Sequence, residues 1–253
     1  MAQAPQLVLA FGNRKVIADP KRFEELKSFY PNSNIVSCST AGEIIGSKVV
    51  DNSIIATAVY FEKTNVRMAK TSVLQEAQND FLAGQHLAER LEGEDLCHVF
   101  IISDGQKVNG TELVRGMNQY HQGRIPITGG LAGDGPNFEK TLVGINEAPT
   151  EGNIVAIGFY GTQLKVGHGS KGGWDPFGPE RLVTKSTHNI LYELDNQSAL
   201  QLYKKYLGPL SAELPSSALL FPLCIRLGES KELLVRTILS VDERNQSMTF
   251  AGD

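Results

Sequence analysis

The chain repeats one ordered series of sequence patterns, and this repeat constrains its fold more than any other feature. Each copy begins with a short apolar run that ends in glycine, continues with a capped amphipathic helix pattern, and reaches a second apolar run before an Ala-Gly-acid loop. Corresponding residues lie 91 to 100 positions apart: Gly12 and Gly105, Ala41 and Ala132, Tyr60 and Tyr160. A series that returns in the same order predicts an internal duplication of a β-α-β-β-β unit.

The copies and the segments beside them define a domain layout. Repeat one covers about residues 6–72, a linking helix about residues 73–93, and repeat two about residues 97–170. Repeat two closes with a predicted strand over residues 163–168. The linking helix is predicted from apolar or small residues that recur three or four positions apart: Leu74, Ala77, Phe81, Gly84, Ala88 and Leu91.

The fold class follows from this layout. We predict a mixed α/β (α+β) protein in which both copies form a sheet system covered by helices over residues 1–195. The beginning of a second α+β domain is predicted over residues 196–253, where an amphipathic helix from Ser198 precedes patterns typical of antiparallel strands. A pseudo-twofold relation between the copies would place the loops Ala41-Gly42-Glu43 and Ala132-Gly133-Asp134 at one cleft.

Composition excludes several classes of function. The 253 residues are 41% hydrophobic, which is sufficient for a sizeable core, and 24 Lys and Arg oppose 28 Asp and Glu. A net charge of -4 disfavours nucleic acid as a partner. The longest stretch without Asp, Glu, Lys or Arg runs from Gly152 to Leu164, shorter than the roughly 20 residues of a membrane-spanning helix. Three cysteines without a CxxC pair, and a start without a signal-peptide pattern, predict a cytoplasmic location.

A long, ordered set of motifs resembles the FIST family. The motifs are Cys38-Ser-Thr-Ala-Gly-Glu43, the glycine-rich run from His168 to Pro179 that contains Trp174, the segment from Val183 to Gly208, and Thr249-Phe-Ala-Gly-Asp253. They extend over nearly the whole chain. The resemblance implies a FIST N-terminal domain followed by the beginning of a FIST C-terminal domain, which is expected to be truncated at Asp253.

The resemblance also implies a function. FIST proteins are cytoplasmic ligand-sensing modules of prokaryotic signal transduction, associated with histidine kinases, diguanylate cyclases and chemoreceptors. Amino acids have been proposed as ligands, and one subgroup consists of haem proteins that sense nitric oxide. We therefore expect a small-ligand sensor without enzymatic activity, with a haem-based nitric oxide sensor as the alternative.

The candidate ligand-binding residues lie in the acidic loops and the glycine-rich run. Glu43 and Asp134 would bind an amine, or each would accept backbone hydrogen bonds in a tight turn. His168 would bind the ligand or haem iron, or would be a core histidine, because strand alternation places it on one face with Leu164 and Val166. Trp174 is expected to line the pocket, and Lys171 or Arg181 to bind a carboxylate.

Other chemistry has weaker signals. Cys38 at a strand end would be the nucleophile of a hydrolase or transferase, or simply a buried small residue. The segment from Asp104 to Gly110 lacks phosphate-binding glycine spacing and is read as an ordinary strand-to-helix turn. His86 and His121 lie in predicted helices without a second ligand at i+4, so no protein-held metal is predicted.

Overall fold

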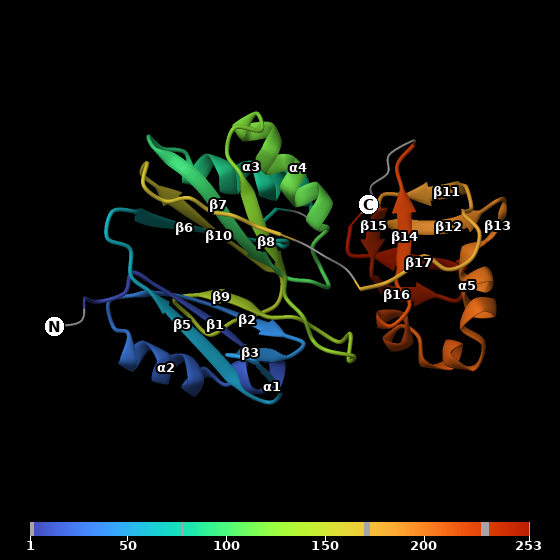
Figure 1. The fold of residues 1–253 in the computed structure, drawn as a ribbon, viewed down its shortest axis with the longest axis horizontal. Helices are drawn as coiled ribbons and strands as arrows, with labels where there is room; N and C mark the ends of the chain where they lie inside the picture. The colour runs from blue at the N-terminus through green and yellow to red at the C-terminus, as the bar shows by residue number, and fades with distance from the viewer. Residues whose placement is uncertain (1–2, 77, 170–172, 229–232, 253) are drawn as a thin grey trace. The chain divides into compact units, whose positions relative to one another are not determined.

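The computed structural model describes residues 3–76, 78–169, 173–228 and 233–252, and these form two compact units (Figure 1). The N-terminal unit comprises the chain up to Gly135 and Glu139–His168. The C-terminal unit comprises Pro136–Phe138 and the chain from Gly169 onward. The predicted mixed α+β fold is confirmed in both units.

The first copy of the duplicated unit forms the first sheet. Its strands β1 (Leu7–Asn13) and β2 (Asn34–Thr40) are parallel, and α1 (Arg14–Ile17) and α2 (Pro20–Phe29) connect them. Helix α2 begins where expected, because Pro20 occupies its first turn and Asp19 Oδ1 accepts the Lys21 N–H at 3.0 Å. The sheet order is β5-β1-β2-β9, and both outer strands run antiparallel to their neighbours. The outer strands are β5 (Ile54–Val59) and β9 (Val143–Ile145).

The second copy repeats this arrangement in a second sheet of order β6-β10-β7-β8. Strands β7 and β8 are parallel, and helix α4 connects them. Strand β10 is antiparallel to β7, just as β5 is antiparallel to β1. The elements are β6 (Asn65–Ser72), β7 (Leu96–Ser103), α4 (Gly110–His121), β8 (Ile127–Leu131) and β10 (Asn153–Tyr160). This topology confirms the predicted duplication. Each copy also contributes a strand to the other sheet: β6 of the first copy pairs with β10, and β9 of the second pairs with β2.

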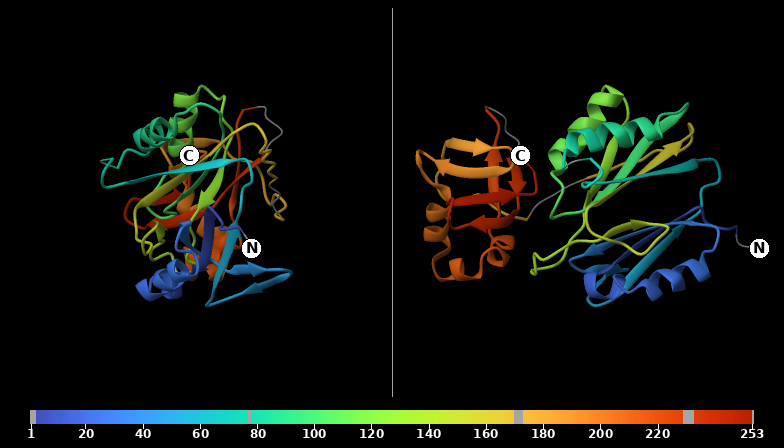
Figure 2. Two further views of the ribbon diagram at one scale, coloured as in Figure 1. Left: turned by 90° about the vertical axis from the view of Figure 1, so that its left-hand side faces the viewer. Right: turned by 180° about the vertical axis from the view of Figure 1, so that it is seen from behind.

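The N-terminal unit has four layers, helix–sheet–sheet–helix (Figures 1 and 2). The apolar core between the sheets includes Leu7, Val36, Ile102 and Ile157. Helices α3 (Asp80–Leu91) and α4 cover the outer face of the second sheet over a separate core. That core contains Ala83, Leu87, Leu91, Leu113, Met117 and Ile154. Strands β3 (Glu43–Ile45) and β4 (Lys48–Val50) form a small hairpin after β2.

The C-terminal unit is a sheet of order β11-β12-β17-β16 packed against helix α5, with β13 beside β12. Strands β14 and β15 form a separate antiparallel hairpin. The elements are β11 (Val183–Thr187), β12 (Ile190–Leu194), β13 (Gln197–Ser198), α5 (Ala199–Leu207), β14 (Leu223–Arg226), β15 (Leu233–Arg236), β16 (Ile238–Asp242) and β17 (Ser247–Phe250), with 3-10 turns at Gly208–Glu213 and Ser216–Leu219. Helix α5 ends at Gly208, whose φ of 57° suits glycine.

Two predicted elements differ from the structure. The linking helix begins at Asp80 rather than near residue 73, because the Asn79 side chain caps the Leu82 N–H at 3.0 Å. Leu74 is 81% exposed in the turn before it, and Ala77 lies outside the described residues. The predicted strand over residues 163–168 is wrong: this described segment pairs with no strand, and only Leu164 packs against the core.

None of the helices in the described part of the chain is both long and apolar enough to cross a membrane.

Candidate functional site

The two Ala-Gly-acid loops lie against each other in the N-terminal unit. They follow β2 and β8, which belong to different sheets. The Gly133 N–H donates to the Ser39 carbonyl at 2.9 Å, so the loop after β8 is bonded directly to the end of β2. A Cβ atom on Gly133 would lie 3.1 Å from the Ala41 nitrogen, which leaves little room for a side chain there. The expected proximity of the two loops is therefore observed.

Glu43 is engaged within its own loop. The residue is buried, with only 1% of its surface exposed. Oε1 accepts a hydrogen bond from the Thr40 hydroxyl at 2.8 Å, and Oε2 accepts one from the Ser53 hydroxyl at 2.8 Å. Oε2 also accepts the Ser53 N–H at 3.3 Å. The turn-forming alternative predicted backbone donors, whereas two hydroxyl groups supply the shorter hydrogen bonds that stabilise the connection from β2 to β5.

Asp134 is likewise buried and forms an ion pair across the junction. Its Oδ1 lies 2.8 Å from Nε of Arg14, whose side chain is 9% exposed. Its Oδ2 accepts the N–H groups of Glu139 at 3.2 Å and Lys140 at 3.3 Å. Glu139 pairs with the same Arg14. The carboxylate thus joins the start of α1 to the loop after β8, and ligand binding by Asp134 stays a prediction.

The remaining predicted ligand residues are distributed between the units. His168 ends the N-terminal unit and is exposed, within electrostatic range of His98. Trp174 and Arg181 belong to the C-terminal unit. Trp174 is 51% exposed, and Arg181 forms an ion pair with Asp195 at 3.1 Å. Lys171 lies outside the described residues.

Cys38 does not have the environment of a nucleophile. It lies in β2 against the core between the sheets, and burial raises the pKa of its thiol to about 12. Only the thiolate attacks or binds metal, so this residue is inert at neutral pH. The alternative of a buried small residue accounts for it.

Asp104 organises the strand-to-helix turn that its sequence predicted. The residue is fully buried, and its Oδ1 accepts hydrogen bonds from the Thr141 hydroxyl at 2.6 Å and the Gln106 N–H at 2.8 Å. Oδ2 accepts the Gly152 N–H at 2.6 Å. The carboxylate is satisfied by loop groups, as in an Asx turn, and supplies no anion-binding site.

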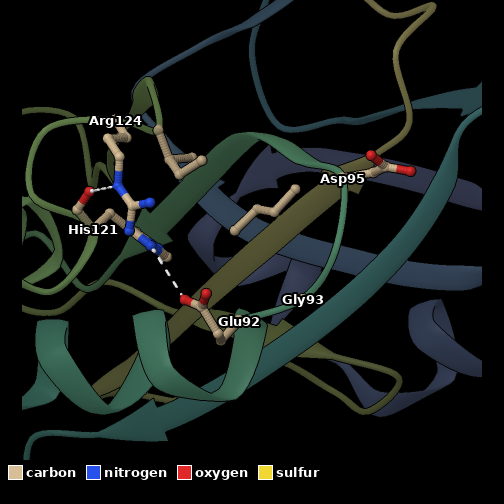
Figure 3. Close-up of a pocket in the computed structure, with 7 residues that line it drawn as sticks. Glu92, Gly93, Asp95, His121 and Arg124 are labelled. Atoms are coloured by element: carbon tan, nitrogen blue, oxygen red, sulfur yellow. Dashed lines mark hydrogen bonds and ion pairs between the residues drawn. The ribbon is translucent and has the colours of Figure 1, made fainter.

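A polar hollow lies near the beginnings of β7 and β8, at the ends of these strands away from the Ala-Gly-acid loops. Helices α3 and α4 end there (Figure 3). Its volume is about 180 Å³. The lining residues are Glu92, Gly93, Asp95, Leu96, His121, Arg124 and Ile125. Among them His121 is only 2% exposed, whereas Glu92, Asp95 and Arg124 are exposed. A buried imidazole therefore lies beside a charged, accessible rim.

The two helices reach this hollow together because they run parallel. At their beginnings the Asn109 N–H donates to Asp80 Oδ2 at 2.9 Å. At their midpoints Gly84 lies so close to α4 that an added Cβ would be 2.1 Å from the Leu113 carbonyl oxygen. At their ends Nδ1 of His121 lies 3.7 Å from Oε2 of Glu92 (Figure 3).

The environment of His121 favours the neutral imidazole. Burial lowers its pKa below the usual value, Glu92 opposes this effect, and the Arg124 guanidinium adds to it. Nε2 is buried and has no hydrogen-bond partner among the described residues. Arg124 donates from its backbone N–H at 3.1 Å and from Nε at 3.2 Å to the His121 carbonyl, which completes the end of α4.

Sequence reasoning considered His121 only as a metal ligand and missed this hollow. A usable signal was present, because His121 follows Leu113 and Met117 at four-residue intervals and so shares their buried face. Within the described residues, no group of three or more His, Cys, Asp or Glu side chains is arranged to hold a metal ion.

The sequence matches the FIST N domain over residues 6–197 and the FIST C domain over residues 199–253. The chain belongs to the FIST family. FIST domains are small-ligand sensory domains of signalling proteins. The chain is also 24% identical over 201 residues to an uncharacterized protein of Methanocaldococcus jannaschii. That match covers 74% of this chain and 37% of the relative, so the chain spans well under half of the relative's length.

Proposed function

We propose that this FIST protein is a cytoplasmic small-ligand sensory module of prokaryotic signal transduction that regulates a partner histidine kinase, diguanylate cyclase or chemoreceptor. The observation that carries the proposal is the FIST N match over residues 6–197, which includes the whole duplicated double-sheet unit. The hydrolase or transferase alternative is not supported by Cys38, because its thiol is protonated at neutral pH.

A sensor must exist in two states that bind the ligand with different affinity. The junction of the Ala-Gly-acid loops is suited to couple the copies, because the Gly133–Ser39 hydrogen bond links β8 in one sheet to β2 in the other. Ligand binding to either copy would shift this contact and so alter the surface offered to a partner. Glu43, Asp134, His168, Trp174, Lys171 and Arg181 stay candidate ligand residues of the sensor.

A thermal-shift screen of the full chain tests the sensory function. The panel contains the amino acids, short amines, short carboxylates and haemin. A ligand at 100 times its Kd stabilises the folded state by about 2.7 kcal/mol. At about 2–4 °C per kcal/mol, a protein of this size should melt several degrees higher. A concentration-dependent rise with at least one compound is expected, and a panel without any shift would contradict the proposal.

The partner is tested in a second step with the ligand so identified. Autophosphorylation of a kinase encoded beside this protein should change on addition of the protein, and the change should depend on the ligand. Equal kinase activity with and without ligand, measured with saturating protein, would exclude control of that partner by ligand.

The haem alternative depends on His168, and no contact in the described residues favours it. An axial histidine is normally oriented by a hydrogen bond to its second ring nitrogen. His168 is exposed, and among the described residues it interacts electrostatically with His98. A Soret band on addition of haemin to the full chain that disappears in His168→Ala would reinstate this alternative.

A further inference from the structure

We propose that the free edge of strand β8 (Ile127–Leu131) pairs with β8 of a second copy of this chain and so forms a two-fold symmetric dimer. Strand β8 ends the sheet of order β6-β10-β7-β8, and within the described part of the chain it pairs with β7 alone. Dimerisation goes beyond the proposed sensory function, because the pairing needs neither a ligand nor any of the candidate ligand residues.

The hydrogen bonds at the two ends of β8 show which backbone groups face the free edge. The Val99 N–H donates to the Pro126 carbonyl at 3.0 Å, and the Ala132 N–H donates to the Ser103 carbonyl at 2.8 Å. The even-numbered residues of this strand therefore direct their backbone groups toward β7. By the same alternation, the odd-numbered residues direct an N–H and a C=O group toward the free edge: Ile127, Gly129 and Leu131.

The internal duplication indicates that this edge suits an antiparallel strand. Strand β2 holds the place of β8 in the first copy, because each is parallel to the strand that precedes its helix. The edge of β2 away from β1 pairs antiparallel with β9: the Asn146 N–H donates to the Ile35 carbonyl at 2.8 Å, and the Ser39 N–H donates to the Leu142 carbonyl at 2.9 Å. An added antiparallel strand would complete β8 as β9 completes β2.

Two copies of β8 are complementary to each other. A two-fold axis places identical strands antiparallel, which is the orientation found between β2 and β9. With Gly129 opposite Gly129 of the second copy, Ile127 of each copy faces Leu131 of the other, and every edge-facing N–H and C=O group meets a partner. Leu131 is 37% exposed in the single chain, and this register places it beside an apolar side chain.

Strand β8 also lacks the charged side chains that protect other sheet edges from association. Arg67 and Lys70 lie on β6 at the opposite edge of the same sheet, whereas Lys185 lies on edge strand β11 and Asp242 on edge strand β16. Two copies of β8 therefore meet without like-charge repulsion. Edge strand β5 is uncharged too, but its exposed residues are small and offer less apolar contact: Ala56, Thr57 and Ala58.

Sedimentation equilibrium of the full chain measures the dimer. Strand β8 has five residues, far fewer than the about 20–30 per side of a standard interface, so we expect a reversible dimer with a Kd of about 10–100 μM. Leu131→Lys should weaken it about tenfold or more, because the substitution acts twice in a two-fold dimer. Leu82→Lys is the matched control. Leu82 is 40% exposed on α3, whose Arg90 donates to the Lys70 carbonyl at the opposite edge of the sheet. Melting curves verify that both variants fold.

Amide hydrogen exchange followed by NMR locates the contact. Exchange of the Ile127, Gly129 and Leu131 amides should slow as the protein concentration rises through the Kd. The Thr128 and Gly130 amides face β7 in the single chain, so their exchange should change less. This alternation would distinguish pairing along β8 from association through another surface.

Three results would overturn the proposal: a single-copy mass up to about 500 μM protein, a dimer of equal strength in Leu131→Lys and Leu82→Lys, or a dimer that protects the amides of another segment and leaves those of β8 unchanged. The sensory function is decided separately by the ligand panel. A chain that binds a ligand and stays monomeric keeps that function and contradicts only the dimer.

Discussion

Replacing Asp134 with Asn tests whether this carboxylate holds the loop junction together. The substitution leaves Arg14 with its side chain 9% exposed and without the partner at 2.8 Å. Breaking a buried ion pair by removing one partner costs about 3–5 kcal/mol. Glu139 still pairs with Arg14, and the Asn oxygen still accepts loop N–H groups, so we expect the lower end, about 3 kcal/mol.

Urea unfolding followed by far-UV circular dichroism measures this loss. Fluorescence of Trp174 is unsuitable, because the residue belongs to the C-terminal unit. Glu139→Gln is the matched control: its side chain is 64% exposed, and the pair it loses should contribute about 0–1 kcal/mol. If Asp134→Asn kept the stability of the wild type within about 0.5 kcal/mol but lost ligand binding, a binding role would replace the structural one.

Three further predictions concern packing, reactivity and pH. Gly84→Ala should lower stability to urea by about 1–3 kcal/mol despite its better helix propensity, because the new Cβ would lie 2.1 Å from the Leu113 carbonyl oxygen; unchanged stability would contradict the close helix contact. Iodoacetamide at pH 8 should modify exposed Cys224 and spare buried Cys38, whose pKa is raised to about 12; equal labelling by mass spectrometry would refute this. Burial lowers the pKa of His98, so the unfolded chain binds the proton more readily and stability should fall as pH drops through about 6.5. His98→Gln should reduce this loss between pH 7.5 and 5.5, measured from urea midpoints, and an identical pH dependence in both proteins would exclude it.

The duplicated unit was predictable because its signals are local. Apolar runs, the Asp19-Pro20 helix start and the recurring Ala-Gly-acid loops each mark an element by short-range chemistry, and their order repeats. The partners of each strand were not predictable in this way. Strands β6 and β9 pair across the copies, and β9 is only Val143–Ile145, too short to produce a clear alternation.

The failed strand over residues 163–168 has a related cause. Alternation predicts which side chains would share a face, but a strand also needs a neighbour for its backbone groups. The described segment has no such neighbour, and Val166 is 45% exposed. The inference that His168 lies on an apolar face fails with it.

The candidate sites also differ in how far the sequence alone predicts them. A turn-forming role of Glu43 and Asp134 was one of two stated alternatives, but some of their partners are distant in sequence: Ser53 lies ten residues from Glu43, and Arg14 lies at the start of α1. The hollow at His121 is lined by residues from the ends of α3 and α4 and from the beginning of β7, the strand that lies between these helices in the sequence. Residues 92 and 121 are far apart in sequence, so only the parallel packing of the helices brings them together.

Hydrogen-exchange mass spectrometry of the full chain, with and without each compound of the ligand panel, tests the sensory account most directly. The account predicts that at least one compound protects its binding site and also changes exchange in a remote segment of the N-terminal unit, since a sensor must shift between two states. Exchange that is identical with and without every compound would contradict it.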